Sequence, residues 1–276
     1  MSVIKNVAIA GSNGALGKPI LEALLQSNKF NITILTRSSS TSTSTYPSSA
    51  TVLPVDFNST QSLTDALQSQ KIDAIVSCVG TEGLLGQKLL IDASVAAGVT
   101  RFIPSEFALP VFGHKVATSS HLEAVAAKNP SFTYTYIRNG GFLDWGLEHN
   151  FILDVTSGKP SIYNGGDKLF SATTLATVAQ AVVAVLSKFE ETKNRAVYIQ
   201  DVQTSQNRLL SIAKKVAPEK NWEVIPVKTA DVLKSSNEKL AKGKLPWRSW
   251  SDTFLLRFLA RNIGRAGKSQ IMNCWV

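Results

Sequence analysis

The first half of the chain alternates short apolar runs with longer segments whose apolar residues recur at helical spacing. Continuous apolar runs bounded by polar residues are typical of strands that are buried on both faces of a parallel sheet. We predict six such strands, at residues 7–10, 31–36, 51–55, 72–79, 101–104 and 132–137. We predict helices between them at residues 16–26, 61–68, 84–97 and 115–127.

Strands that alternate with helices in this way form βαβ units, which wind right-handed into a parallel sheet. The sequence therefore predicts an α/β fold, a Rossmann-like doubly wound parallel sheet with helices on both faces.

The pattern is less regular after residue 146. Thr174 is placed as the N-cap of a helix. The further elements predicted here are a helix at 175–186, a strand at 196–199, and helices at 205–216, 230–240 and 251–262. We expect a first domain over residues 1–145 and a smaller C-terminal region over 146–276, partly interleaved with the first sheet.

The composition excludes several classes of protein. The 276 residues are 44% hydrophobic and 18% charged, which suits a chain with a buried core and not a disordered one. No apolar run approaches the roughly 18 residues of a membrane span, and the N-terminal apolar stretch ends at Gly11, too early for a signal peptide. We therefore expect a cytoplasmic protein. Its two cysteines, Cys78 and Cys274, predict neither a disulfide framework nor a metal site.

The net charge of +9 comes from the C-terminal part of the chain. Residues 1–204 contain 15 basic and 15 acidic residues, whereas residues 205–276 contain 14 basic and 5 acidic ones. Such a region can contact nucleic acid, an anionic membrane surface or an acidic ligand, or it can be a solvated helical face. The spaced motifs of RNA- and DNA-binding domains are absent. We expect a small-molecule substrate and no nucleic-acid partner, and a homo-oligomer stays open.

The strongest local motif is GSNGALG, which directly follows the first predicted strand and opens the first helix. Glycines at such a turn allow a tight bend, close approach of the backbone to a pyrophosphate, and close packing of helix on strand. The helix N-terminus offers free N–H groups and a positive dipole end to phosphate. Glycines at this spacing also occur in ordinary turns, but the position within a βαβ series favours a dinucleotide site. The predicted phosphate-binding residues are Gly11, Ser12, Asn13, Gly14, Ala15, Leu16 and Gly17.

The end of the second strand distinguishes NAD from NADP. NAD sites usually carry Asp or Glu there for the ribose 2′-OH, and NADP sites carry Arg. The segment LTRSS has no carboxylate; Arg37 can pair bidentately with a 2′-phosphate, and Ser38 can add a hydrogen bond. An ordinary exposed arginine is the alternative, but the pattern predicts NADPH/NADP+ as the cofactor. The other predicted cofactor contacts are Asp56 near the adenine and Cys78, Val79 and Gly80 near the nicotinamide ribose.

Several strings spread in order along the chain carry a resemblance to a known family. They are GSNGALG, LTRSS, RFIPSEF at 101–107, LPVFGHK at 109–115, FTYTY at 132–136, GFLDW at 141–145 and YNGGD at 163–167. With these strings the chain resembles the NmrA-like and isoflavone-reductase-like family of atypical short-chain reductases, in particular its fungal members. The resemblance implies NADPH binding and reduction of a small, often aromatic or phenolic, secondary metabolite.

The resemblance also implies a catalytic residue. No Tyr has a Lys four positions later, so the YxxxK pair of ordinary short-chain dehydrogenases is absent. The family places a lysine at the start of the helix after the PSEF segment, and Lys115 fits that position. We predict Lys115 as a general acid/base and cofactor contact, because a partly dry cleft and a helix N-terminus disfavour its charged form. An exposed helix lysine is the alternative.

The predicted substrate-binding residues are Phe107, His114, Phe142 and Trp145. Phe142 and Trp145 follow the sixth strand and are equally compatible with core packing. Two segments depart from the family pattern: the loop at 107–109 is shorter than in relatives, and residues 264–276 do not resemble the usual ending.

Three functions are compatible with these residues. The first is an NADPH-dependent reductase that transfers hydride from nicotinamide C4 to an enone, imine or carbonyl group, with Lys115 supplying a proton. The second is a non-catalytic NADP-sensing regulator, a role that some NmrA-like proteins have. The third is a non-redox enzyme on the same fold. Lys115 favours the reductase, because a sensor needs no lysine near the nicotinamide.

Overall fold

The computed structural model describes residues 4–38, 46–80, 83–107, 113–232 and 234–235, and it divides into two compact units. In the described part, the first unit contains the chain up to Arg138 together with Ala176–Ile199. The second contains Asn139–Leu175 and the segment from Gln200 onward. Trp145, the last residue of the first predicted domain, lies in the second unit. The division into an NADP-binding domain (1–145) and a substrate-binding region (146–276) stays a prediction.

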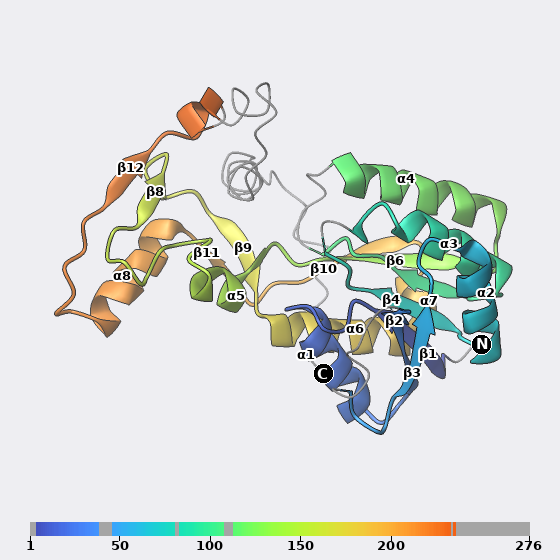
Figure 1. Ribbon diagram of the computed structural model, residues 1–276. Helices are drawn as coiled ribbons and strands as arrows, with labels where there is room; N and C mark the ends of the chain where they lie inside the picture. The colour runs from blue at the N-terminus through green and yellow to red at the C-terminus, as the bar shows by residue number, and fades with distance from the viewer. Residues whose placement is uncertain (1–3, 39–45, 81–82, 108–112, 233, 236–276) are drawn as a thin grey trace. The chain divides into compact units, whose positions relative to one another are not determined.

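The first unit is built on a seven-stranded sheet in which all neighbouring strands are parallel (Figure 1). The strand order is β10-β6-β5-β4-β1-β2-β3, the order of dinucleotide-binding folds with β10 added at one edge. The strands are β1 (Asn6–Ala10), β2 (Asn31–Arg37), β3 (Thr51–Val55), β4 (Ala74–Ser77), β5 (Arg101–Ile103), β6 (Thr133–Arg138) and β10 (Arg195–Tyr198). The predicted doubly wound Rossmann-like fold is confirmed.

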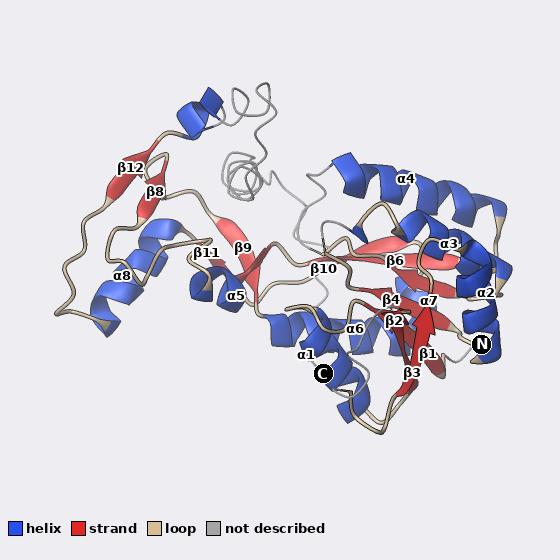
Figure 2. Ribbon diagram, in the orientation of Figure 1, coloured by secondary structure: helices blue, strands red, loops and turns tan. Residues whose placement is uncertain are grey.

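Helices cover both faces of this sheet (Figures 1 and 2). They are α1 (Gly17–Gln26), α2 (Thr60–Ser69), α3 (Gln87–Ala96), α4 (Gly113–Lys128), α6 (Leu175–Ser187) and the short α7 (Phe189–Thr192). The helices α2, α3 and α4 pack side by side on one face, and α1 and α6 lie on the other. On the α2–α4 face, the buried core joins Leu63, Ile91 and Leu122 of the three helices to Phe102 of the sheet.

The central strand β4 is shorter than predicted. All four of its residues are buried, which fits an apolar run in the middle of a parallel sheet. The expected strand at 72–79 was wrong at both ends, because the apolar pattern extends past the ladder. Asp73 lies before the strand, and its carboxylate accepts hydrogen bonds from the backbone N–H groups of Lys5 and Asn6, both at 2.8 Å.

A buried arginine ties α7 to the amino end of the sheet. Arg101, the first residue of β5, is fully buried. Its guanidinium donates to the hydroxyls of three threonines and to the Phe189 carbonyl, and it lies 4.3 Å from the centre of the Phe189 ring. The threonines are Thr133 at 2.9 Å, Thr135 at 2.8 Å and Thr192 at 3.0 Å. Burial lowers the pKa of Arg101 to about 10, against the opposing charge of Glu190.

The second unit consists of short elements. A three-stranded sheet contains β7 (Gly141–Phe142), β9 (Phe170–Thr173) and β11 (Val202–Thr204), and a two-stranded one pairs β8 (Ser161–Tyr163) with β12 (Ile225–Val227). The helices are α5 (Leu143–Glu148) and α8 (Gln206–Val216). The buried amide of Gln206 donates to the carbonyls of Ile152 and Ser161 and accepts from the Tyr163 N–H, so one side chain of α8 holds β8 and the segment at Ile152 together.

The C-terminal predictions are tested only in part. Residues 229–232 are helical, at the start of the helix predicted over 230–240. The described residues do not include the end of that helix at 236–240, the helix predicted over 251–262 or the unusual ending at 264–276. Within the described ranges, none of the helices has the length and apolar character needed to cross a membrane.

Candidate active site

The turn between β1 and α1 has the geometry of a phosphate-binding loop. Gly11 adopts φ +81°, and a Cβ there would lie 2.6 Å from the Cys78 carbonyl oxygen. A Cβ on Gly17 would overlap the Gly11 carbonyl. These two positions therefore require glycine for conformation and for close packing. Gly14 differs, because a Cβ there would lie 3.5 Å from the nearest protein atom, an ordinary contact.

The N-terminus of α1 fits an anionic group. Its N-cap, Leu16, forms no side-chain cap, and the first turn contains no acidic residue. Asn13, Gly14 and Ala15 are exposed ahead of the helix. The Lys18 N–H donates to the Gly14 carbonyl and Pro19 has no N–H. The donors for an anion are therefore expected from the residues ahead of Lys18, and the helix adds its positive dipole end. The buried hydroxyl of Ser12 lies 3.4 Å from the Tyr46 hydroxyl.

The predicted adenosine-binding residues lie at the ends of β2 and β3. Arg37 is the exposed last residue of β2, paired in register with Val55 of β3, and Ser38 follows it. The Ser38 N–H donates to the Val55 carbonyl at 3.0 Å. The Asp56 carboxylate accepts a hydrogen bond from the Asn58 N–H at 2.9 Å. Asp56 thus shapes the turn into α2, and its contact with adenine stays a prediction.

The end of β4 lies beside the phosphate loop. The Cys78 N–H donates to the Ala10 carbonyl of β1 at 2.8 Å. Burial raises the pKa of the Cys78 thiol, so this side chain is a neutral apolar filler. The Ser77 hydroxyl is buried without a hydrogen-bond partner in the described part of the chain. A Cβ on Gly80 would have no protein atom within 4 Å. Gly80 therefore lines space that the described protein does not fill.

Together these features fit a nicotinamide dinucleotide. The loop at Gly11–Gly17 supplies a phosphate cradle, Arg37 supplies a cation where a 2′-phosphate would lie, and Gly80 leaves room at the end of β4. No carboxylate occupies the last position of β2.

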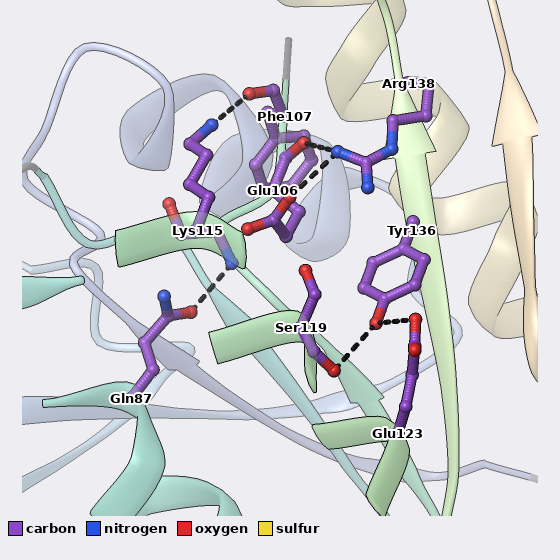
Figure 3. Close-up of polar contacts among 9 residues, drawn as sticks. Gln87, Glu106, Phe107, Lys115, Ser119, Glu123, Tyr136 and Arg138 are labelled. Atoms are coloured by element: carbon purple, nitrogen blue, oxygen red, sulfur yellow. Dashed lines mark hydrogen bonds and ion pairs between the residues drawn. The ribbon is translucent and has the colours of Figure 1, made fainter. Parts of the chain in front are cut away.

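Lys115 is buried near the start of α4, on the side where the strands end (Figure 3). Its Nζ donates to the Phe107 carbonyl at 2.6 Å. Burial lowers the pKa of Lys115 to about 8; Glu106 acts against this shift and Arg138 adds to it. A lysine with such a pKa populates both protonation states near neutral pH, as a general acid/base requires.

An ion pair lies beside Lys115. Glu106 is fully buried, and its Oε2 accepts a hydrogen bond from Arg138 Nη1 at 2.8 Å. The same Nη1 donates to the Glu106 carbonyl at 3.0 Å. Arg138 also lies 4.9 Å from the Tyr136 ring centre, and the Tyr136 hydroxyl donates to Glu123 at 2.9 Å. Glu106 joins the end of β5 to the end of β6 (Figure 3).

A second polar cluster fixes the backbone that leads to Glu106. The Ser105 N–H donates to Gln87 Oε1, and the Ser105 hydroxyl donates to the Val79 carbonyl, both at 2.8 Å. Gln87 Nε2 and the Thr118 hydroxyl both donate to the Leu84 carbonyl. The segments after β4 and β5 are therefore held to each other and to α3 and α4.

The structure places the predicted substrate residues in two groups. Phe107 is buried and binds Lys115 through its carbonyl, and His114 precedes Lys115 in α4 and is half-buried. Phe142 and Trp145 lie in the second unit, both half-buried. Trp145 stacks on His149 with ring centres 4.5 Å apart. Contact of these four residues with substrate stays a prediction, and residues 108–109 of the shortened loop lie outside the described residues.

Among the residues that the structure describes, no group of three or more His, Cys, Asp or Glu side chains is arranged to hold a metal ion. His121 instead lies 2.7 Å from the Asp92 carboxylate.

Comparison with known proteins shows the family. The profile of the NmrA-like family matches residues 4–242. The chain belongs to the NmrA-like family. It is 36% identical to Oxidoreductase poxI of Penicillium oxalicum over 251 residues, which cover 86% of this chain and 78% of the relative. It is 34% identical to Oxidoreductase aprR of Aspergillus flavus over 252 residues, 87% of this chain and 82% of the relative. The resemblance seen in the sequence strings is confirmed.

The fold of this NmrA-like protein is also similar to solved structures. The binary complex of leucoanthocyanidin reductase with NADPH from Vitis vinifera superposes with a TM-score of 0.76 at 21% identity, covering 92% of this chain and 87% of that one. This likeness supports the Rossmann-like architecture described above.

Sequence reasoning missed several residues of this candidate site. Glu106 stands in the string RFIPSEF, three residues after the end of the buried strand β5, and an acidic residue at that place is a signal that could have been used. Arg138 ends the sixth strand in the same way. Gln87 gave no comparable signal, because a glutamine near the start of a helix is common.

Proposed function

We propose that this NmrA-like protein is an NADPH-dependent reductase of a small, aromatic or secondary-metabolite substrate that carries an enone, imine or carbonyl group. The observation that carries the proposal is the burial of Lys115 beside the ends of β5 and β6, in the unit that contains the phosphate loop. The similarity to two fungal proteins named oxidoreductases supports a redox reaction.

The cofactor would be held by the residues described above. The cradle at Gly11–Gly17 takes the pyrophosphate, Arg37 and Ser38 take the 2′-phosphate, and the backbone near Gly80 borders the nicotinamide ribose. NADPH, when bound, supplies the hydride from nicotinamide C4. The similarity of the fold to a reductase–NADPH complex supports this choice of cofactor.

Lys115 provides the proton. Its Nζ is oriented by the Phe107 carbonyl, which accepts one of its hydrogens at 2.6 Å. Because its pKa is about 8, the protonated form is abundant at neutral pH and loses its proton more readily than an exposed lysine. Lys115 can therefore donate a proton from Nζ to the substrate atom that becomes electron-rich during reduction, and can regain it from solvent.

A parallel calorimetric titration with NADPH, NADP+ and NADH tests the proposal, followed by a screen for NADPH oxidation with aromatic enones, imines and carbonyl compounds. We expect tight binding of NADPH, much weaker binding of NADH, and oxidation with at least one substrate class. Absence of NADPH binding would overturn the proposal. Tight NADP+ with poor NADPH binding and no turnover would favour an NADP-sensing regulator instead.

A further inference from the structure

The two charged side chains nearest to Lys115, Glu106 and Arg138, pair with each other and not with Lys115. Lys115 donates to a carbonyl and forms no ion pair with a carboxylate among the described residues, although Glu106 is close enough to influence its pKa. The Glu106 carboxylate pairs with Arg138 instead, at 2.8 Å. Its other oxygen, Oε1, is buried and has no hydrogen-bond partner in the described segments. The carboxylate therefore has unused capacity to accept a hydrogen bond.

The charged and titratable groups on the elements around Lys115 fall into two sets, those whose charges act on Lys115 and those whose charges do not. Glu106 follows β5, and Arg138 and Tyr136 belong to β6. On α4 itself lie His114 beside Lys115, His121, and Glu123, which accepts from Tyr136. On α3, Asp92 lies against His121, and Lys88 is half-buried. Of all these groups, Glu106 and Arg138 are the two whose charges act on Lys115.

The two neighbours act in opposite directions. A carboxylate stabilises the ammonium form of a nearby lysine, and a guanidinium destabilises it. While Arg138 is paired with Glu106, the two charges oppose each other at Lys115, and burial is the largest influence on its pKa. Without Arg138, the Glu106 carboxylate would be a buried charge without a partner, which is unfavourable in free energy. It would then attract the ammonium group of Lys115.

We propose that Arg138 is a positioning residue: by holding the Glu106 carboxylate in an ion pair, it keeps that carboxylate from pairing with Lys115 and leaves Lys115 able to exchange a proton. This inference rests on the proposed acid/base role of Lys115, because only a lysine that changes protonation state needs such an arrangement. A lysine in a direct pair with Glu106 would hold its proton more tightly and would be a weaker acid toward the substrate.

The test uses substitutions that remove each charge alone. Arg138→Gln leaves Glu106 uncompensated, so the pKa of Lys115 rises by about one unit or more. Glu106→Gln leaves Arg138 uncompensated, so the pKa of Lys115 falls by a similar amount. The matched controls are Arg195→Gln on β10 and Glu22→Gln on α1, both exposed; they remove the same charges elsewhere and should leave this pKa unchanged.

The pKa is read directly by NMR of protein carrying 13C-labelled lysine, with the Lys115 resonance assigned by its loss in Lys115→Met. Opposite shifts in the two variants support the inference. A Glu106–Arg138 pair that stabilises the fold without acting on Lys115 through its charges would shift the Lys115 pKa in neither variant, or in the same direction in both. Equal or absent shifts overturn it. Arg138→Lys keeps the positive charge and should restore the value of the unmodified protein.

The double variant Glu106→Gln/Arg138→Gln keeps the test valid if Arg138→Gln does not fold. It removes both charges, so its Lys115 pKa should be higher than in Glu106→Gln and near that of the unmodified protein; a value equal to that of Glu106→Gln overturns the inference. The readout is independent of turnover. If the protein does not bind NADPH but the two variants shift the Lys115 pKa in opposite directions, the charge coupling is supported and the reductase function is overturned. If the protein shows NADPH-dependent turnover but the Lys115 pKa does not move, the reductase function is supported and the charge coupling is overturned.

Discussion

Two buried cations lie at opposite ends of the same parallel sheet, and their surroundings differ. Arg101, at the amino end, gives its hydrogens to three threonine hydroxyls and one carbonyl and packs on an aromatic ring. Among the residues that the structure describes, Lys115, at the carboxyl end, donates to a single carbonyl. Burial lowers the pKa of Arg101 to about 10 and that of Lys115 to about 8.

This difference separates a cation that stabilises the fold from one that is suited to chemistry. A guanidinium keeps its charge and presents several donors in a fixed plane, so it can join many segments. A lysine amine shifts its pKa readily when buried and can release a proton. Within the described segments, the cation with fewer hydrogen bonds lies at the carboxyl end of the sheet, where ligands of such folds bind.

The largest expected effect concerns Arg101. Arg101→Ala removes all of these contacts and leaves a cavity, so we expect a loss of about 3–5 kcal/mol in the free energy of unfolding. Urea denaturation followed by circular dichroism measures it. Arg195→Ala, an exposed arginine on β10, is the control and should change stability by less than about 0.5 kcal/mol. A comparable loss in the two variants would contradict the anchoring role.

Lys115→Met should affect chemistry instead. We expect turnover to fall by about two orders of magnitude, the usual contribution of acid/base catalysis, with affinity for NADPH nearly unchanged. Steady-state kinetics together with calorimetry separate the two quantities. Lys128→Met, at the exposed end of the same helix, should retain full turnover. Full activity in Lys115→Met would remove this residue from the mechanism.

The pH dependence of stability sharpens the comparison further. The folded pKa of Lys115, about 8, is below its ordinary value of 10.5. Between these values the unfolded chain binds more protons than the folded one, so this group makes the free energy of unfolding rise as the pH increases from about 8 to 10.5. The Lys115→Met variant should lack this rise, and the difference between the two proteins should grow by about 1–3 kcal/mol across the window. Parallel denaturation curves at pH 7 and pH 10 test it; curves that stay equally spaced would contradict it.

The smallest expected effect concerns a third cation, the exposed Arg37 at the end of β2. Arg37→Ala should weaken NADPH binding about tenfold, the value of one charge-assisted contact in a partly exposed site, and should leave NADH binding nearly unchanged. Calorimetric titration with both nucleotides measures it. Equal losses for NADPH and NADH would exclude the 2′-phosphate role.

The sequence predicted the first sheet well because its central strands β1, β2, β4 and β5 are almost entirely buried, which makes their apolar runs continuous. The elements β8, β9, β11 and β12 were missed, because strands of three or four residues with half-exposed positions leave too short a pattern. Trp145 could not be assigned for a related reason: its stacking on His149 depends on the unpredicted helix α5.

The site was predictable where a local rule applies and unpredictable where distant segments meet. Gly11 and Gly17 follow from the chemistry of one turn, and the structure gives each a steric reason to be glycine. The ion pair between Glu106 and Arg138 joins residues 32 positions apart, and no local sequence pattern predicts it. The burial of Arg101 was also unpredictable from local sequence, because a charged residue is usually exposed and its partners Phe189 and Thr192 lie far along the chain.

The contacts of Arg101 also set an order of events during protein synthesis. Its partner Thr192 follows it by 91 positions. At bacterial to eukaryotic elongation rates of about 5–20 residues per second, Arg101 leaves the ribosome roughly 5–20 seconds before Thr192 does. By the end of that interval the nascent chain contains β5 and β6, with the acceptors Thr133 and Thr135, but it still lacks the Phe189 carbonyl and the Thr192 hydroxyl that also accept from the guanidinium. Completion of the first unit therefore waits until Ala176–Ile199 has been synthesised, because this segment supplies most of α6, together with α7 and β10.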